Sequence, residues 1–306
     1  MRRTGETILL AFLFVVGGIL FMVSCDGDES PVEGGMVAPG MIVFESDRDS
    51  GNYEIYAVSD TGGQNTRLTF TPDEEDRPDI SLDGSKIAFR VDSGNGYEIA
   101  VMDRDGSNYT YLTSNSYYDS DARWSPDGSK IAFVADSSGD NEIYTMDANG
   151  SNVVRVTTRV GTNDNDPSWS NDGQKLVFLS DPDGNPDIFT ISINGTGLNR
   201  LTTTSESEGD PAWSRNGQLI AYALTDSITG DRQINTINAA NGSNLTNLSN
   251  NLFSEEDPYW SPDGNWIAFR SNRDGNLEIY VMRANGADQT RITNDPGIDQ
   301  VPSWGR

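Results

Sequence analysis

Carboxylates at a fixed spacing are the residues of this chain that could do chemistry. Four aspartates each lie three residues before a tryptophan: Asp121, Asp166, Asp210 and Asp257. These four could together bind a hard cation such as Ca²⁺, which takes about six to eight oxygen ligands. They could instead hydrogen-bond backbone N–H groups at turns, or bind a basic peptide. The residues alone leave these three interpretations open.

Other reactive side chains are scarce. The chain has no histidine and one cysteine, Cys25, which excludes Ser-His-Asp triads and histidine-ligated zinc or iron sites. Its three lysines, Lys86, Lys130 and Lys175, occupy the same place in successive repeats, so they are expected to be structural. We therefore predict that the chain is not an enzyme.

An internal repeat must position the aspartates. Its anchor residues are spaced 44, 45, 44, 47 and 44 residues apart, and they are Ile80, Trp124, Trp169, Trp213, Trp260 and Trp304. A period in the forties with tight turns is typical of β-propeller blades. Because a residue that recurs in every repeat belongs to the scaffold, we expect these tryptophans to be core residues.

Each repeat reads as four short antiparallel strands. In the unit 121–157, Ser125-Pro126-Asp127-Gly128 has the chemistry of a tight hairpin turn, since Pro presets φ and Gly accepts the left-handed conformation. The next strand, Ile131-Ala132-Phe133, is apolar on both faces, as in a sheet packed between two neighbours. We expect its small residue to leave room for large residues of the next blade.

Counting the strands predicts how the ring closes. The strand Ile42-Val43-Phe44 has no anchor segment before it, and the anchor around Trp304 has no second strand after it. Joining the two ends completes a sixth blade, which leaves no wide sheet edge exposed. The predicted fold is all-β, a six-bladed propeller of four-stranded antiparallel blades. Its C-terminal strand joins the blade begun at Met41.

In such a ring, equivalent positions of all blades face one mouth of the central channel. We therefore predict a ring of ligand candidates at this mouth, formed by Asp76, Asp121, Asp166, Asp210, Asp257 and Asp299. Asp76 and Asp299 lie one or two residues further out than the other four. The loops that follow the second strands are also acidic, so this face is predicted to be strongly negative.

The N-terminal segment predicts an envelope location. Residues 1–24 read as a lipoprotein signal peptide and 25–40 as a flexible acidic tether, ahead of the propeller at 41–306. Met22-Val23-Ser24-Cys25 resembles the bacterial lipoprotein processing box, which implies lipidation of Cys25. The expected location is the bacterial cell envelope, with the chain lipid-anchored and facing the periplasm or the cell surface.

The net charge of −26 argues against nucleic acid as a partner and against membrane contact other than through the lipid. We expect a monomer whose acidic face binds a protein or peptide in the envelope, with Ca²⁺ as a candidate ion. Two alternatives remain: an enzyme, carbohydrate-active or of another kind, that uses two carboxylates, and a purely structural envelope protein.

The unit Trp260–Ser271, followed by Glu278-Ile279-Tyr280 and Arg291-Ile292-Thr293, resembles the repeat of TolB-type six-bladed propellers. The resemblance extends from Met41 to Arg306, and it implies the propeller fold and binding of peptide segments at the channel. TolB has an α/β domain before its propeller, and related peptidases have a hydrolase domain; neither is expected here. Breaks in the repeat, such as Ile80, Arg77 and Val301, predict an asymmetric mouth where a ligand could bind.

Overall fold

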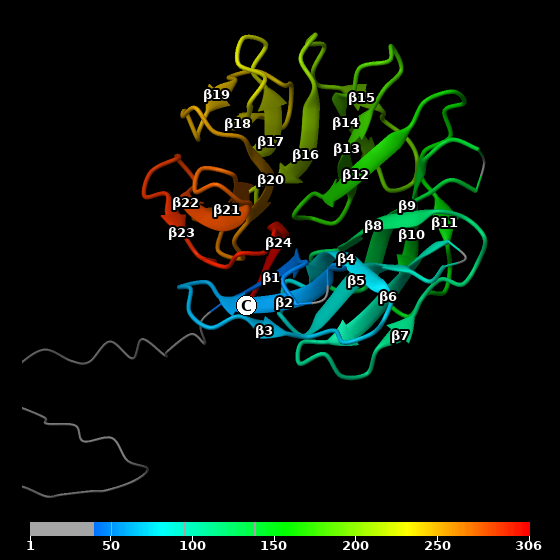
Figure 1. Ribbon diagram of the computed structural model, residues 1–306. Coiled ribbons are helices and arrows are strands. Elements are labelled where there is room, and N and C mark those ends of the chain that lie inside the picture. The colour runs from blue at the N-terminus through cyan, green and yellow to red at the C-terminus, as the bar shows by residue number, and fades with distance from the viewer. Residues whose placement is uncertain (1–39, 50, 95, 138) are drawn as a thin grey trace, which may run out of the picture. The chain divides into compact units, whose positions relative to one another are not determined.

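The computed structural model describes residues 40–49, 51–94, 96–137 and 139–306. These residues form six four-stranded antiparallel sheets, arranged as the blades of a propeller (Figure 1). The predicted signal peptide 1–24, the lipidation candidate Cys25 and the rest of the tether up to residue 39 lie outside the described residues. Among the residues that are described, no helix is long and apolar enough to cross a membrane.

The strands follow one another with short turns, and the outermost strand of each blade has only two residues. In chain order they are β1 Met41–Ser46, β2 Glu54–Ser59, β3 Thr66–Arg67, β4 Glu74–Ile80, β5 Lys86–Asp92, β6 Tyr97–Asp103, β7 Thr110–Tyr111, β8 Asp119–Trp124, β9 Lys130–Ala135, β10 Glu142–Asp147, β11 Val154–Arg155, β12 Asp164–Trp169, β13 Lys175–Ser180, β14 Asp187–Ser192, β15 Asn199–Arg200, β16 Glu208–Trp213, β17 Leu219–Thr225, β18 Arg232–Asn238, β19 Thr246–Asn247, β20 Glu255–Trp260, β21 Trp266–Ser271, β22 Glu278–Arg283, β23 Thr290–Arg291 and β24 Asp299–Gly305.

The ring closes as predicted. Blade 1 has the strand order β24-β1-β2-β3, so the C-terminal strand completes the blade that begins at Met41. Ile42 lies opposite Trp304 in the register of β1 and β24. Figure 1 shows the red β24 beside the blue β1. Blades 2 to 6 each take four consecutive strands, and their innermost strands are β4, β8, β12, β16 and β20.

The tight turns after the anchors confirm that the recurring serines are structural. Gly128 closes its turn through an N–H bond of 2.9 Å to the Ser125 carbonyl, with φ at 69°. The Ser125 hydroxyl donates to Asp127 over 2.7 Å and accepts from the Lys130 N–H over 2.9 Å. The Ser125 hydroxyl thus makes both of its bonds within its own turn, as expected for a residue that stabilises the turn.

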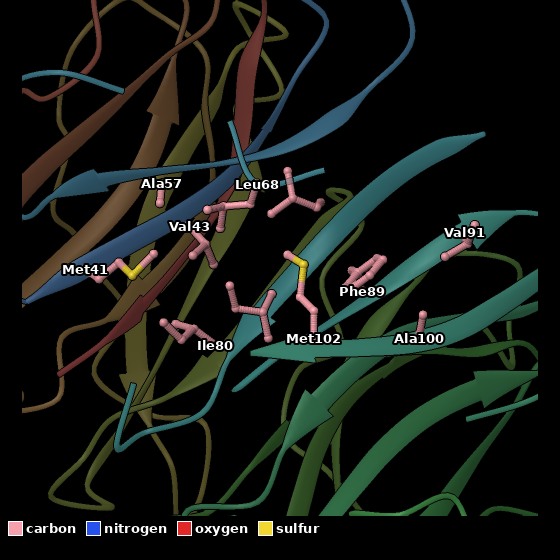
Figure 2. Packing of buried hydrophobic residues seen from close by; sticks show 11 residues of the cluster. Met41, Val43, Ala57, Leu68, Ile80, Phe89, Val91, Ala100 and Met102 are labelled. Carbon is pink, nitrogen blue, oxygen red and sulfur yellow. The ribbon is translucent and has the colours of Figure 1, made fainter. Parts of the chain in front are cut away.

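Packing between blades forms the core. Figure 2 shows the cluster between blades 1 and 2, where Val43 of β1 lies among Ile80, Phe89 and Met102 of the next blade. The same packing recurs between blades 2 and 3, where Ala88 of β5 is fully buried and lies in one cluster with the Phe133 side chain. The predicted fit of a small residue against the large residues of the next blade is therefore confirmed.

Candidate functional site

A β-bulge in each innermost strand explains the recurring aspartates. One residue of each innermost strand has a positive φ, between 49° and 56°, and we call these six the bulge positions: Arg77, Asp121, Asp166, Asp210, Asp257 and Val301. The register of every innermost strand shifts there. Aspartate tolerates the left-handed conformation better than most residues, because its short side chain bonds locally. Backbone geometry alone thus favours Asp at these positions.

The bulges surround a central cavity of about 420 Å³. All six innermost strands contribute to its wall, with Arg77 from β4, Arg123 from β8, Asp166 from β12, Asp210 from β16 and Asp257 from β20. Val301 and Pro302 of β24 complete the circle. We call the end of the cavity at the bulge positions the mouth. The volume of the cavity is in the range of pockets that bind small molecules or single side chains.

Four of the six predicted ligand candidates line this cavity: Asp76, Asp166, Asp210 and Asp257. Asp121 lines an adjoining groove of about 340 Å³ and forms an ion pair with Arg77. Asp166 and Arg77 line both spaces, so the groove lies directly beside the cavity.

The placement of Asp299 in the ring is corrected. Asp299 is fully buried away from the cavity wall, and its carboxylate accepts two bonds from Arg48 of the loop after β1, at 2.6 and 2.7 Å. It lies two residues before the bulge position Val301. Side chains alternate along a strand, but a bulge inserts one extra residue and reverses which face the preceding residues occupy. The sequence prediction counted residues back from Trp304 without this extra residue, so it wrongly placed Asp299 at the cavity.

Arginines balance several of the carboxylates at the mouth, and apart from Arg77 the sequence pattern did not place them there. The Arg90 Nε donates to Asp76 over 2.7 Å. Arg270 donates to Glu256 over 2.7 Å, and its Nε lies 2.9 Å from an Asp257 oxygen. The predicted strongly negative mouth is thus a mixed network of charges.

Arg232 reaches the mouth from the third strand of blade 5 and donates to Glu256 over 2.8 Å. It passes over Gly209 of β16, where a Cβ would lie 2.0 Å from the Arg232 Nη2. Any larger residue at position 209 would therefore displace the guanidinium from this place.

Two carboxylates at the mouth have no close partner. Asp210 lies 3.9 Å from Arg232 and Asp166 lies 3.7 Å from Arg77, and neither accepts a hydrogen bond from any described residue. Burial and the nearby Asp121 raise the pKa of Asp166 to about 6. Burial, with the charges of Asp257 and Asp166, raises the pKa of Asp210 well above its ordinary value. A cationic group placed here would relieve this repulsion.

The metal-site interpretation gains no geometric support. Within the described residues, no group of three or more Asp, Glu, Cys or His side chains is placed to hold a metal ion. Asp121 and Asp257, two of the four Ca²⁺ candidates, already face Arg77 and Arg270. At these two carboxylates, arginine side chains of the protein supply the positive charge.

Residues just before the anchors form the opposite end of the cavity, which we call the floor. They do not follow the repeat, and only two of them are of the same type: Asp79, Arg123, Ser168, Ala212, Tyr259 and Ser303. Arg123, Ser168, Ala212 and Tyr259 line both the central cavity and a smaller space of about 30 Å³ beyond it. The sequence pattern missed these residues, although their failure to repeat was a signal that could have found them.

The comparisons with known proteins agree with this geometry. A family model described as the TolB beta propeller domain matches residues 116–257 and 210–306, which is more than half of the chain. The chain belongs to the TolB β-propeller family. A search of curated proteins found no match to this TolB β-propeller.

Solved structures share the TolB β-propeller fold at low identity. TolB from Acinetobacter baumannii has a TM-score of 0.74 and 21% identity, over 87% of this chain and 67% of that one. A chain from a nidogen/laminin complex has a TM-score of 0.68 and 9% identity, over 88% of this chain and 98% of that one. An oligogalacturonate lyase in complex with manganese has a TM-score of 0.57 and 16% identity, over 84% and 74%. Identities this low show the fold alone.

Proposed function

We propose that this TolB β-propeller is a non-enzymatic binding module of the bacterial cell envelope. It takes a segment of a protein or peptide partner into the central cavity, and it is tethered to the membrane through lipid on Cys25. The observation that supports this is the pair Asp166 and Asp210. Asp76, Glu256 and Asp257 of the same cavity pair with arginines, whereas these two have no cation closer than 3.7 Å.

A basic group of the partner would supply the missing charge. Most of the free-energy cost of a buried ion pair comes from the loss of water around each ion. Asp166 and Asp210 are already partly desolvated in the cavity, so part of this cost is incurred before a partner binds. A lysine or arginine side chain would therefore gain from both carboxylates at once. The structural likeness to TolB, and to a chain found in a nidogen/laminin complex, is consistent with a protein partner.

Site-specific photocrosslinking in the native envelope tests the proposal. A benzophenone amino acid replaces Asn163, which is exposed at the groove, or Val154, which is 54% exposed on the outer strand β11. We expect a protein adduct from position 163, none from position 154, and loss of the adduct in Asp210→Asn. Equal adducts at both positions, or none at either, would contradict the proposal.

A carbohydrate-active enzyme is the second candidate, and one observation favours it. Asp121 and Asp166 flank Arg77, yet their pKa values move apart. Burial opposes ionisation of Asp121, but Arg77 and Arg123 outweigh it and lower its pKa, whereas the pKa of Asp166 rises to about 6. Paired carboxyls with opposed environments are typical of acid–base catalysis. Turnover of neutral or acidic oligosaccharides that Asp166→Asn abolishes would establish this function and overturn the first.

A further inference from the structure

The arginines at the floor differ from those at the mouth. Arg77, Arg90, Arg232 and Arg270 each have a carboxylate oxygen within 4.0 Å. Arg123 at the floor has none within that distance among the described residues, and neither has Arg215 beside it. The hydrogen bond formed by the Arg123 guanidinium runs to the carbonyl of the preceding residue, at 3.3 Å. Arg215 lies over the Tyr259 ring, 5.8 Å from its centroid.

The nearest buried carboxylate does not neutralise Arg123 by contact. The Asp79 oxygens accept from the Trp124 N–H at 2.7 Å and from the Ser303 hydroxyl at 3.1 Å. A guanidinium stays charged and offers five donors, and a charge withdrawn from water without a partner is costly. An anion in the cavity would satisfy Arg123.

Hydroxyl groups around Arg123 suit a carboxylate. Tyr259 and Ser168 line the cavity beside it. Burial, followed by the charge of Asp79, raises the pKa of Tyr259 to about 12, so its hydroxyl stays protonated, and it lies within reach of Asp79 as well as the cavity. A guanidinium with nearby hydroxyl donors is a favourable environment for a planar carboxylate.

The floor also limits how a ligand can enter. Beyond Arg123 the channel narrows to a space of about 30 Å³, lined by Trp124, Trp169, Trp213 and Trp260. Such a space holds one or two water molecules. A polypeptide therefore cannot pass through the channel, and a chain end that enters from the mouth stops at the floor beside Arg123. The end that Arg123 attracts is the C-terminus.

We infer that Arg123 binds the C-terminal carboxylate of the partner segment, while Asp166 and Asp210 bind a basic group of the same segment near the mouth. This inference rests on the proposed function, and it adds that the partner is recognised by its chain end.

Two pools of N-acetylated tetrapeptides test the inference by calorimetric titration of the full chain. Both have lysine at the second position and neutral residues elsewhere, and they differ only in ending with a free carboxylate or a carboxamide. We expect the acid pool to bind at least tenfold more tightly than the amide pool. In Arg123→Met the two pools should bind equally, whereas the control Arg283→Met, on an exposed arginine, should keep the difference.

Each other outcome has a distinct meaning. Equal binding of the two pools by the unmodified chain overturns the C-terminal inference and leaves the proposed function standing, even if Arg123→Met does not fold. Binding of neither pool, together with no crosslinked partner, overturns both. Binding of trigalacturonate that Arg123→Met removes, without peptide binding, would retain an anion site but exclude the peptide as its occupant.

Discussion

The mouth and the floor of the cavity are two ends of the same six strands, but they are built in different ways. At the mouth, one bulge recurs in every blade, and its preferred residue, aspartate, recurs with it. At the floor, no residue has a positive φ, and the six blades contribute five different types of side chain. The repeated aspartates at the mouth therefore reflect backbone geometry. The backbone does not fix the residue types at the floor, so these side chains are the ones that evolution can adapt to a ligand.

Charge is balanced differently at the two ends. Four arginines at the mouth pair with carboxylates of their own or of neighbouring strands, but four carboxylates of the cavity have no close guanidinium partner in the part of the chain that the structure describes: Asp166, Asp210, Glu45 and Glu74. The floor holds Arg123 and Arg215 without a carboxylate within 4.0 Å among the described residues. The channel is consequently polarised along its axis, with negative charge in surplus at the mouth and positive charge at the floor.

Packing at the floor end should give the largest effect on stability. Trp260 is 3% exposed and donates from its indole to the Ala212 carbonyl of the adjacent blade at 3.1 Å. We expect Trp260→Ala to lower the free energy of unfolding by about 3–5 kcal/mol, measured by urea denaturation. Trp213 is more exposed, and its indole donates to the Gly217 carbonyl in its own turn. We expect Trp213→Ala to lower the free energy of unfolding clearly less than Trp260→Ala does. Equal losses would show that the bond between blades does not matter.

Electrostatics at the mouth should give an intermediate effect that depends on pH. The pKa of Asp166 is about 6 in the folded chain, against an ordinary value of 3.8. Between these values the folded state holds a proton that the unfolded state has released, so this contribution to stability is complete below pH 3.8 and is lost as pH rises through 6. We expect Asp166→Asn to stabilise the chain by about 1–3 kcal/mol at pH 8, and hardly at pH 4. Thermal unfolding at both pH values measures this.

The control for this prediction is Asp127 in a surface turn. Bonds from the Ser125 hydroxyl and the Ser129 N–H lower the pKa of Asp127, which is the opposite shift. Asp127→Asn should therefore destabilise the chain at pH 8. A gain of stability in both variants would mean that general charge repulsion, rather than the mouth, is responsible.

Backbone strain at the mouth should give the smallest effect. Val301 occupies a bulge position with φ at 51°, which is an outlier for a β-branched residue. We expect Val301→Asn to raise the free energy of unfolding by about 1 kcal/mol, because asparagine tolerates this conformation. The control Val301→Thr keeps the branched Cβ and should change little. If both substitutions raise stability alike, the gain does not come from φ.

The sequence alone determined the architecture of the propeller. Six anchors, the Ser-Pro-Asp-Gly turns and the offset between Ile42 and Trp304 were sufficient to predict the blades and their closure. These features are local: each turn and each alternation of side chains is decided by residues a few positions apart. The same local pattern also placed Asp76, Asp166, Asp210 and Asp257 at the cavity.

Only the tertiary structure decided the charge of the site. Arg232 lies 22 residues after Asp210 in the sequence and reaches the mouth because Gly209 leaves space for it. The bulge moved Asp299 to the buried side of its strand, where Arg48 from the other end of the chain meets it. Coulomb interactions depend on distance in space, and side chains from different strands and blades come together only when the ring closes. A repeat can therefore predict where each strand lies, but not which of its charges remain unpaired.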